Sequence, residues 1–305
     1  MKRRNFINSV TLLSGLSAMP SLAFAASSLS NGAVNKAPLK KGLGFGMIRE
    51  ELPLVDKFKL VKDLGFDGIE FNSPVDIPVS EMLEAKSKTG IVIPSVVNKD
   101  HWSKPLSDPD PQVRQACIKS VAQSLQDVKE LGGDTVLVVP GVVNEKVSYE
   151  QAYNTSLESI RQIIPYAEKT GMHIGIENVW TNFLLSPVEA KRFVDDINHP
   201  LVGWYFDIGN VLRYGWPEHW IKTLNSRILK LHIKEFSREL MNNKGLRHGF
   251  DVALLEGDNN WPVVMKAVSE INYKGGWITA EVDGGDRNHL QKISRQMDVI
   301  LSYLP

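Results

Sequence analysis

The sequence predicts a protein of the α/β class, folded as a single closed (β/α)8 TIM barrel. From Gly42 onward, short apolar runs rich in β-branched residues alternate with longer amphipathic runs, which is the pattern of parallel strands covered by helices. Eight such pairs fit into about 260 residues, close to the usual size of this barrel. An open Rossmann-type sheet alternates in the same way, but no G-x-G-x-x-G motif follows the first run, so the barrel is favoured.

The expected strands are short runs in which apolar and β-branched residues predominate. They cover residues 42–47, 68–71, 92–97, 135–139, 173–177, 203–207, 228–232 and 277–282. The helices expected between them include residues 55–64, 111–131, 149–170 and 261–271. Gly65, Gly132 and Gly171 follow helical runs and suit the left-handed residue that closes a helix. The one long connection, residues 236–260, is a candidate lid or substrate loop.

Residues 1–25 have the features of a cleaved export signal. Lys2, Arg3 and Arg4 precede a weakly apolar stretch that ends in Ala-Phe-Ala, the small-x-small pattern that signal peptidases cut. The paired arginines followed by x-Phe-Ile are similar to a twin-arginine signal, which predicts a periplasmic location; a general secretory signal is the alternative. The stretch is too short to span a bilayer as a stable helix. We expect residues 26–40 to form a flexible leader and residues 41–305 to form the barrel domain.

Charge and cysteine content limit the partners of the chain. Lys and Arg together number 35, as do Asp and Glu; removal of residues 1–25 takes away three basic residues and no acidic one, which leaves a net charge of −3. A nucleic-acid partner is therefore disfavoured, and no stable membrane insertion is expected. The single cysteine, Cys117, lies in an expected helix and is interpreted as a buried apolar residue.

Polar residues end the last four expected strands. The residues that stand where these apolar runs stop are Glu177, Asp207, His232 and Glu281. In a (β/α)8 barrel the carboxyl ends of the strands form the working face, so these side chains should converge there. Three buried carboxylates in one barrel mouth repel one another, and a divalent metal resolves the conflict. The alternative is that each acid pairs with a nearby base such as Lys234.

The predicted ligand set contains three carboxylates, one imidazole and no thiol. Such an oxygen-rich set suits Mn²⁺, Co²⁺ or Mg²⁺ better than a structural zinc. The predicted cofactor is one divalent ion, with Mn²⁺ as the first choice and Co²⁺, Mg²⁺ or Zn²⁺ as alternatives.

Short motifs surround the predicted ligands. They are Glu177-Asn178, Phe206-Asp207-Ile208-Gly209-Asn210, His232-Ile233-Lys234 and Glu281, together with Gly68-Ile69-Glu70 in the second strand. In these motifs the chain resembles the xylose isomerase-like TIM-barrel superfamily, in particular its sugar (phosphate) isomerase/epimerase group, which includes ketose 3-epimerases and pentulose-phosphate 3-epimerases. The likeness covers nearly the whole chain after the expected signal.

The resemblance implies that Glu177, Asp207, His232 and Glu281 bind one divalent metal, and that the two glutamates are the catalytic acid and base. It implies a sugar epimerase or isomerase that acts on a ketose or keto-sugar through a cis-enediolate. β-Elimination from a keto-glycoside begins with the same proton removal and stays open, as does a non-catalytic sugar-binding barrel. The expected partner is a small-molecule sugar, and assembly into a homo-oligomer is left open.

Two further residues are substrate-binding candidates by resemblance. Arg238 lies six residues beyond His232, where the ketose 3-epimerases carry a substrate-contacting arginine. Asn210 replaces a histidine of those enzymes, so it can hydrogen-bond a hydroxyl but cannot titrate near neutral pH. Phe183 stands where those enzymes have another substrate-binding acid, so the sugar specificity can differ from theirs.

Four other candidates for the pocket follow from position in the chain. Lys234 shares the strand parity of the predicted histidine ligand and so faces inward, toward the substrate or toward Glu70. Glu70 is itself a candidate to support the ligands or contact substrate. His101 and Trp102 follow the third expected strand, where they would cover the pocket, the tryptophan by stacking on a sugar face.

Overall fold

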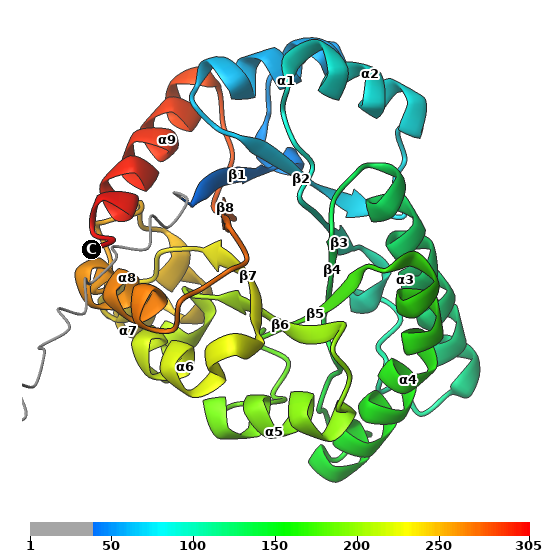
Figure 1. Ribbon diagram of the computed structural model, residues 1–305. Coiled ribbons are helices and arrows are strands. Elements are labelled where there is room, and N and C mark those ends of the chain that lie inside the picture. The colour runs from blue at the N-terminus through cyan, green and yellow to red at the C-terminus, as the bar shows by residue number, and fades with distance from the viewer. Residues whose placement is uncertain (1–38) are drawn as a thin grey trace, which may run out of the picture. The chain divides into compact units, whose positions relative to one another are not determined.

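A computed structural model describes residues 39–305. Within this part, parallel strands close into a barrel in which each strand pairs with its neighbours in the chain and β8 pairs with β1 (Figure 1). The strands are β1 (Lys40–Gly44), β2 (Gly68–Ser73), β3 (Ser95–Asn98), β4 (Thr135–Val138), β5 (His173–Glu177), β6 (Val202–Asp207), β7 (Ile228–Ile233) and β8 (Trp277–Ala280). The predicted (β/α)8 architecture is confirmed. The expected export signal and nearly all of the expected leader lie outside the described residues.

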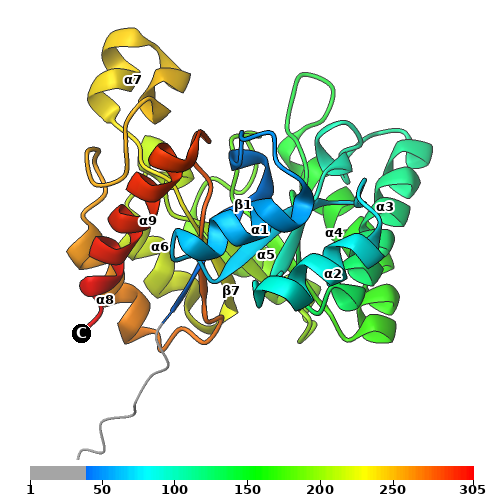
Figure 2. The ribbon, with the colours of Figure 1, turned by 90° about the horizontal axis from the view of Figure 1, so that it is seen from above.

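Helices surround the strands on the outside of the barrel (Figure 1). They are α1 (Leu54–Asp63), α2 (Val79–Thr89), α3 (Pro111–Glu130), α4 (Tyr149–Thr170), α5 (Pro187–Ile197), α6 (Pro217–Leu224), α8 (Trp261–Glu270) and α9 (Arg287–Ser302). A further helix, α7 (Arg238–Lys244), stands clear of this layer (Figure 2). The predicted helices differ from the observed ones by at most one residue at an end, and Gly65, Gly132 and Gly171 have the expected positive φ of 83°, 76° and 76°.

Only β5 has the predicted bounds; β4, β6 and β7 differ by one residue, β2 extends two residues further, and β1, β3 and β8 differ as follows. β1 begins at Lys40, where the expected leader ends, and gives way to a short 3-10 turn after Gly44. β3 begins only at Ser95, because Pro94 has no N–H to donate to the ladder, and Val92 keeps a single isolated bridge. β8 ends two residues early, at Ala280. These shifts leave the order and direction of the strands unchanged.

The strands are rigid supports for whatever lies at their ends. β4 and β6 are buried along their whole length, and the apolar side chains of the barrel and its helices form one continuous core. Cys117 is fully buried in α3, as predicted. Within residues 39–305 no helix combines the length and the apolarity needed to cross a bilayer.

The long connection between β7 and α8 is more ordered than a simple loop. Within residues 236–260 it contains α7 and a 3-10 helix, and its return limb is held by the buried carboxylate of Glu235. This carboxylate accepts hydrogen bonds from the main-chain N–H groups of Leu255 (2.9 Å) and Asn259 (3.1 Å) and from the indole of Trp261 (2.8 Å). The connection therefore forms a fixed wall beside the barrel mouth.

Candidate active site

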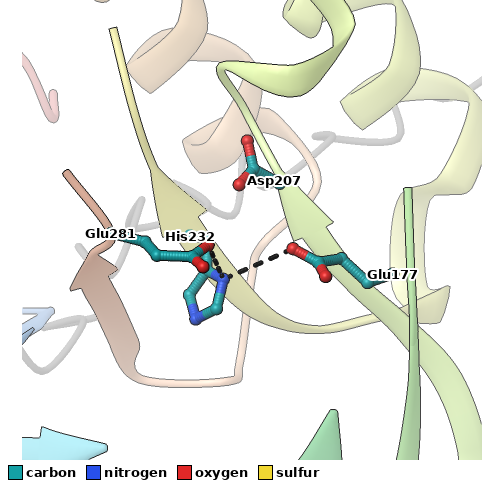
Figure 3. A group of neighbouring side chains, drawn as sticks. All are labelled: Glu177, Asp207, His232 and Glu281. Atoms are coloured by element: carbon teal, nitrogen blue, oxygen red, sulfur yellow. Dashed lines mark ion pairs between the residues drawn. The ribbon is translucent and has the colours of Figure 1, made fainter. Parts of the chain in front are cut away.

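Four side chains meet at the carboxyl ends of the last strands. Their ligand atoms all lie within 4.8 Å of one another, and they belong to Glu177 on β5, Asp207 on β6, His232 on β7 and Glu281 just after β8. Glu177 and Glu281 approach the imidazole of His232 from opposite sides (Figure 3). The distances from His232 Nδ1 are 3.6 Å to Glu177 Oε1 and 3.0 Å to Glu281 Oε2. The structure thus brings together the four residues that the sequence predicted as metal ligands.

Three atoms in this cluster are buried without a hydrogen-bond partner among the described residues. They are Glu177 Oε1, Asp207 Oδ2 and His232 Nδ1. A buried polar atom left in this way costs about 1–3 kcal/mol, and more when it is charged. Because these atoms face one another and all can donate a lone pair, a divalent cation among them would satisfy all three. The residues present therefore fit the predicted metal ion.

Glu70 determines how His232 presents its ring. Glu70 Oε2 lies 2.7 Å from His232 Nε2, and the other carboxylate oxygen accepts hydrogen bonds from the hydroxyls of Ser95 (2.6 Å) and Tyr205. Burial disfavours the charged imidazole of His232, but the carboxylates of Glu70 and Glu281 outweigh it and raise its pKa well above the usual value. With Nε2–H directed to Glu70, Nδ1 is the nitrogen that would bind a metal, which would displace the proton of Nδ1, as in carboxylate–histidine–metal arrangements.

The acids of the cluster carry more negative charge than their neighbours balance. Burial raises the pKa of Glu177 to about 7, and the charge of Glu281 adds to this effect. Burial also raises the pKa of Asp207, although Lys234 opposes it. Burial acts on Glu281 in the same sense, but Lys234 and His232 outweigh it, so the pKa of this carboxyl lies below its usual range. One lysine and one imidazole thus face an excess of carboxylates, which a divalent cation would correct.

Lys234 lies between two of the predicted ligands. Its Nζ is 2.9 Å from Glu281 Oε2 and 3.0 Å from Asp207 Oδ2, the latter an ion pair without hydrogen-bond geometry. The alternative pairing of Lys234 with Glu70 is wrong, because Glu70 is engaged by the histidine. Close packing of the β6 loop brings Lys234 here: a Cβ on Gly209 would come within 2.4 Å of the Lys234 Cβ, so only glycine fits.

Asn178 and Asn210 hold Asp207 in place. The main-chain N–H of Asn210 donates to Asp207 Oδ1 (2.8 Å), and its side-chain amide donates to the carbonyl of Asn178 (2.9 Å). The Asn178 side chain in turn accepts from the Asp207 N–H (3.1 Å) and donates to its carbonyl (2.8 Å). Asn210 therefore stabilises the position of Asp207 through hydrogen bonds within the protein. Asn178 was not among the predicted site residues, although its place directly after Glu177 in the shared motif was the available signal.

Arg238 joins two loops at the rim of the barrel. Its guanidinium donates to the carbonyls of Leu212 and Gly215, both at 2.8 Å, and lies over the ring of Trp216. These donors are engaged with the main chain, so Arg238 fixes the start of α7 against the loop after β6. His101 and Trp102 lie on the 3-10 turn after β3, where His101 is 1% exposed and Trp102 is 58% exposed.

A cavity of about 680 Å³ opens beside Lys234 and Glu281. It lies between the β7–α8 connection, which contributes Phe250, and the first turns of α9, which contribute His289 and Gln296. Its size is typical of sites for small molecules, and its lining combines an aromatic ring with amide, imidazole and charged groups. A substrate held at the four-residue cluster therefore has room to extend toward α9.

Comparison with known proteins places the chain in a family. The sequence pattern of the xylose isomerase-like TIM barrel family matches residues 58–303. The chain belongs to this family. Membership agrees with the closed barrel and with the resemblance inferred from the motifs around Glu177, Asp207 and His232.

Relatives within the xylose isomerase-like family are sugar epimerases and isomerases at low identity. The chain is 22% identical over 244 residues to a putative L-ribulose-5-phosphate 3-epimerase, SgbU, of Escherichia coli K12, covering 76% of this chain and 84% of that protein. It is 23% identical over 261 residues to the 2-oxo-tetronate isomerase of Pectobacterium atrosepticum, covering 79% and 91%. The fold matches D-psicose 3-epimerase of Clostridium cellulolyticum H10, solved with D-tagatose, with a TM-score of 0.71 at 19% identity over 87% and 99% of the two chains. It also matches the 3-keto-D-glucoside 4-epimerase YcjR of E. coli, with a TM-score of 0.70 at 16% identity over 87% and 99%.

Proposed function

We propose that this chain is a divalent-metal-dependent epimerase or isomerase that acts on a ketose or keto-sugar. The observation that carries the proposal is the placement of two glutamates, Glu177 and Glu281, on opposite sides of His232 Nδ1 at the end of the barrel. The relatives support it, because proteins similar to this chain in sequence and fold include sugar epimerases and an isomerase.

The proposed metal would be held by Glu177, Asp207, His232 and Glu281. We expect Mn²⁺, with Co²⁺, Mg²⁺ or Zn²⁺ as alternatives, because the donor set is rich in oxygen. When bound, such an ion stabilises the negative charge that develops beside a carbonyl group on loss of a proton. Glu70 and Asn210 orient two of the proposed metal-binding side chains. The arrangement of these side chains is therefore in place before a metal or a substrate binds.

The two glutamates would carry the proton transfers. One carboxylate takes the proton from the carbon next to the carbonyl, and the other returns a proton to the opposite face, which inverts that carbon. If the proton returns instead to the former carbonyl carbon, while the hydroxyl proton of the deprotonated carbon moves to the former carbonyl oxygen, the same pair of residues isomerises the sugar. Lys234, which contacts Glu281, can stabilise the negative charge of this carboxylate whenever Glu281 is deprotonated during the reaction.

Exchange of carbon-bound hydrogen with solvent tests the proposal. Wild-type protein with Mn²⁺ in D₂O should incorporate deuterium next to the carbonyl of a keto-sugar, measured by NMR with D-psicose, D-tagatose and L-ribulose as probes. E177Q and E281Q should each abolish incorporation, whereas E84Q, on an exposed face of α2, should exchange like wild type. Calorimetric titration with Mn²⁺ shows whether a variant that does not exchange has lost proton transfer or has lost metal binding. Full exchange by either glutamine variant with metal bound would remove that glutamate from the mechanism.

β-Elimination from a keto-glycoside is a second candidate, favoured by the cavity toward α9. A monosaccharide at the four-residue cluster would fill only part of this 680 Å³ space, and the second group of a glycoside could enter the rest. Incubation with a 3-keto-glucoside distinguishes the two reactions: elimination releases the aglycone alcohol, and epimerisation leaves the glycoside intact. Deuterium exchange without release would exclude the lyase.

We also propose that the protein is exported to the periplasm, on the basis of Arg3, Arg4 and the Ala-Phe-Ala segment of residues 23–25. Phosphorylated sugars are scarce outside the cytoplasm, so an unphosphorylated sugar is the expected substrate. Cell fractionation of wild type and of the R3K/R4K variant tests this: the wild type should appear in the periplasm and the variant should be retained. Equal export of both would argue for the general secretory route, and retention of both would contradict export.

A further inference from the structure

His101 is a buried histidine in a turn that the protein holds firmly. The side-chain carbonyl of Asn98 accepts the main-chain N–H groups of Asp100 (3.2 Å) and His101 (3.1 Å). The amide of Asn98 donates to the hydroxyls of Ser120 (2.9 Å) and Ser124 (3.0 Å) on α3. The turn after β3 is thus fixed to the helix behind it, and the imidazole of His101, 1% exposed, has a defined position at the end of the barrel that carries the proposed metal ligands.

The hydrogen bond to one ring nitrogen assigns the proton on the other. The main-chain N–H of Val139, just after β4, donates to His101 Nδ1 at 3.3 Å. A neutral imidazole has one N–H, so accepting at Nδ1 places the proton of His101 on Nε2. This Nε2 is buried and has no hydrogen-bond partner in the described part of the chain. An N–H group left in this state costs about 1–3 kcal/mol, which a ligand oxygen would recover.

His101 lies at the carboxyl ends of β3 and β4, the end of the barrel that carries the proposed metal ligands. Burial lowers the pKa of His101 to about 4, and the carboxylates of Glu281 and Asp100 partly oppose this effect. The ring is thus neutral at ordinary pH. The ring lies at the ends of β3 and β4, and Glu281 follows β8, which lies opposite β4 in the ring of eight strands. Since Nε2 carries the proton, it has no lone pair to offer a metal.

We propose that His101 is a specificity-determining residue, whose Nε2–H donates a hydrogen bond to an uncharged oxygen of the sugar, a hydroxyl or the carbonyl, from the β3–β4 side of the mouth. This proposal rests on the proposed function. The metal ligands come from β5 to β8, so a substrate held by them presents its other side to β3 and β4. A fixed neutral donor there favours a hydroxylated sugar over a deoxygenated analogue, because the analogue leaves the donor unpaired.

Two substitutions separate the two nitrogens of His101. In H101N the side-chain carbonyl can still accept the N–H of Val139, but no donor reaches the position of Nε2. In H101Q an amide N–H can reach that position. We expect H101N to keep the thermal stability and Mn²⁺ affinity of wild type and to bind D-tagatose about 10-fold more weakly, measured by calorimetry in the presence of Mn²⁺, whereas H101Q should recover most of the loss.

The outcomes distinguish this proposal from failure of the proposed function. If wild type binds D-tagatose but exchanges no deuterium, the proposed reaction is wrong. The comparison of the D-tagatose affinities of wild type and H101N still tests the role of His101. Unchanged sugar affinity in H101N would overturn the proposal, as would loss of Mn²⁺ affinity, which would make His101 a ligand. If H101N does not fold, the affinities of wild type and H101Q for monodeoxy analogues of the ketose replace the measurement on H101N. Both proteins should bind one of these analogues more weakly than the parent ketose. Equal affinity for every analogue would overturn the proposal.

Discussion

Glu70 governs which nitrogen of His232 faces the other ligands. A carboxylate 2.7 Å from Nε2 keeps a proton there and so directs Nδ1 toward the other ligands, and Ser95 and Tyr205 donate hydrogen bonds to this carboxylate. The same residue that the sequence suggested as a partner of Lys234 thus acts on the histidine. Groups that support a metal ligand in this way affect metal affinity nearly as strongly as the ligands do.

The variant E70Q should therefore bind metal more weakly while remaining folded. The glutamine carbonyl can still accept the His232 Nε2–H, but the negative charge that makes the imidazole a better ligand is lost. We expect Mn²⁺ affinity to fall about 10- to 100-fold in calorimetric titration. D127N, which neutralises a comparably buried carboxylate on α3, is the control and should keep wild-type affinity. Equal affinity in E70Q and wild type would refute a role for Glu70 in metal binding.

At the scale of elements, the connection between β7 and α8 depends on one buried acid. Glu235 comes directly after β7 and Lys234, and its two oxygens receive N–H groups from the return limb and from α8. The barrel strand that carries His232 therefore also positions the wall of the cavity. Glycine is also required where the return limb packs on this acid, since a Cβ on Gly257 would meet the Glu235 side chain at 2.6 Å.

We expect E235A to loosen residues 252–259 and to lower the free energy of unfolding by about 3 kcal/mol, because several hydrogen bonds to a buried carboxylate are lost. Hydrogen–deuterium exchange measured by mass spectrometry should show faster exchange in that segment. E256A is the matched control, since Glu256 lies in the same segment and forms only an exposed ion pair with Lys292. Unchanged exchange of the segment in E235A would show that the limb is held by other contacts.

At the scale of the whole molecule, metal binding should stabilise the fold. The four ligands come from separate strands, so they meet only in the folded barrel, and a metal that binds them shifts the equilibrium toward the folded state. A free metal concentration of 100 times the Kd adds about 2.7 kcal/mol.

For a domain of this size, that gain should raise the melting temperature by about 5–10 °C, measured by scanning calorimetry with and without Mn²⁺. Repeating the measurement with Co²⁺, Mg²⁺ and Zn²⁺ ranks the metals. D207N should lose most of the increase, because the variant removes the charge of one of the four proposed ligands. An equal increase in D207N, or none in wild type with any of the four ions, would contradict the metal site.

Parts of the fold followed directly from local sequence. β5 and α4 have the predicted bounds, because each combines a clear apolar period with a distinct end: Glu177 closes the strand, and Ser148 caps the helix while Gly171 closes it. β3 was less predictable, since Pro94 interrupts an apolar run without changing its composition. The helix α7 within residues 236–260 was missed because it buries no residue and so shows no apolar period, although Ser237, which accepts the N–H of Leu240, caps its start.

The sequence by itself determined the barrel and its four converging ligands. The alternation of strands and helices fixes the direction of every strand, and direction alone places Glu177, Asp207, His232 and Glu281 at one end. Only the tertiary structure decided the partners of the surrounding groups, such as Lys234 with Asp207, Glu70 with His232, and Arg238 with two loop carbonyls. These contacts join strands and loops far apart in the chain, and they depend on distances of a few ångströms across the ring, which no local pattern encodes.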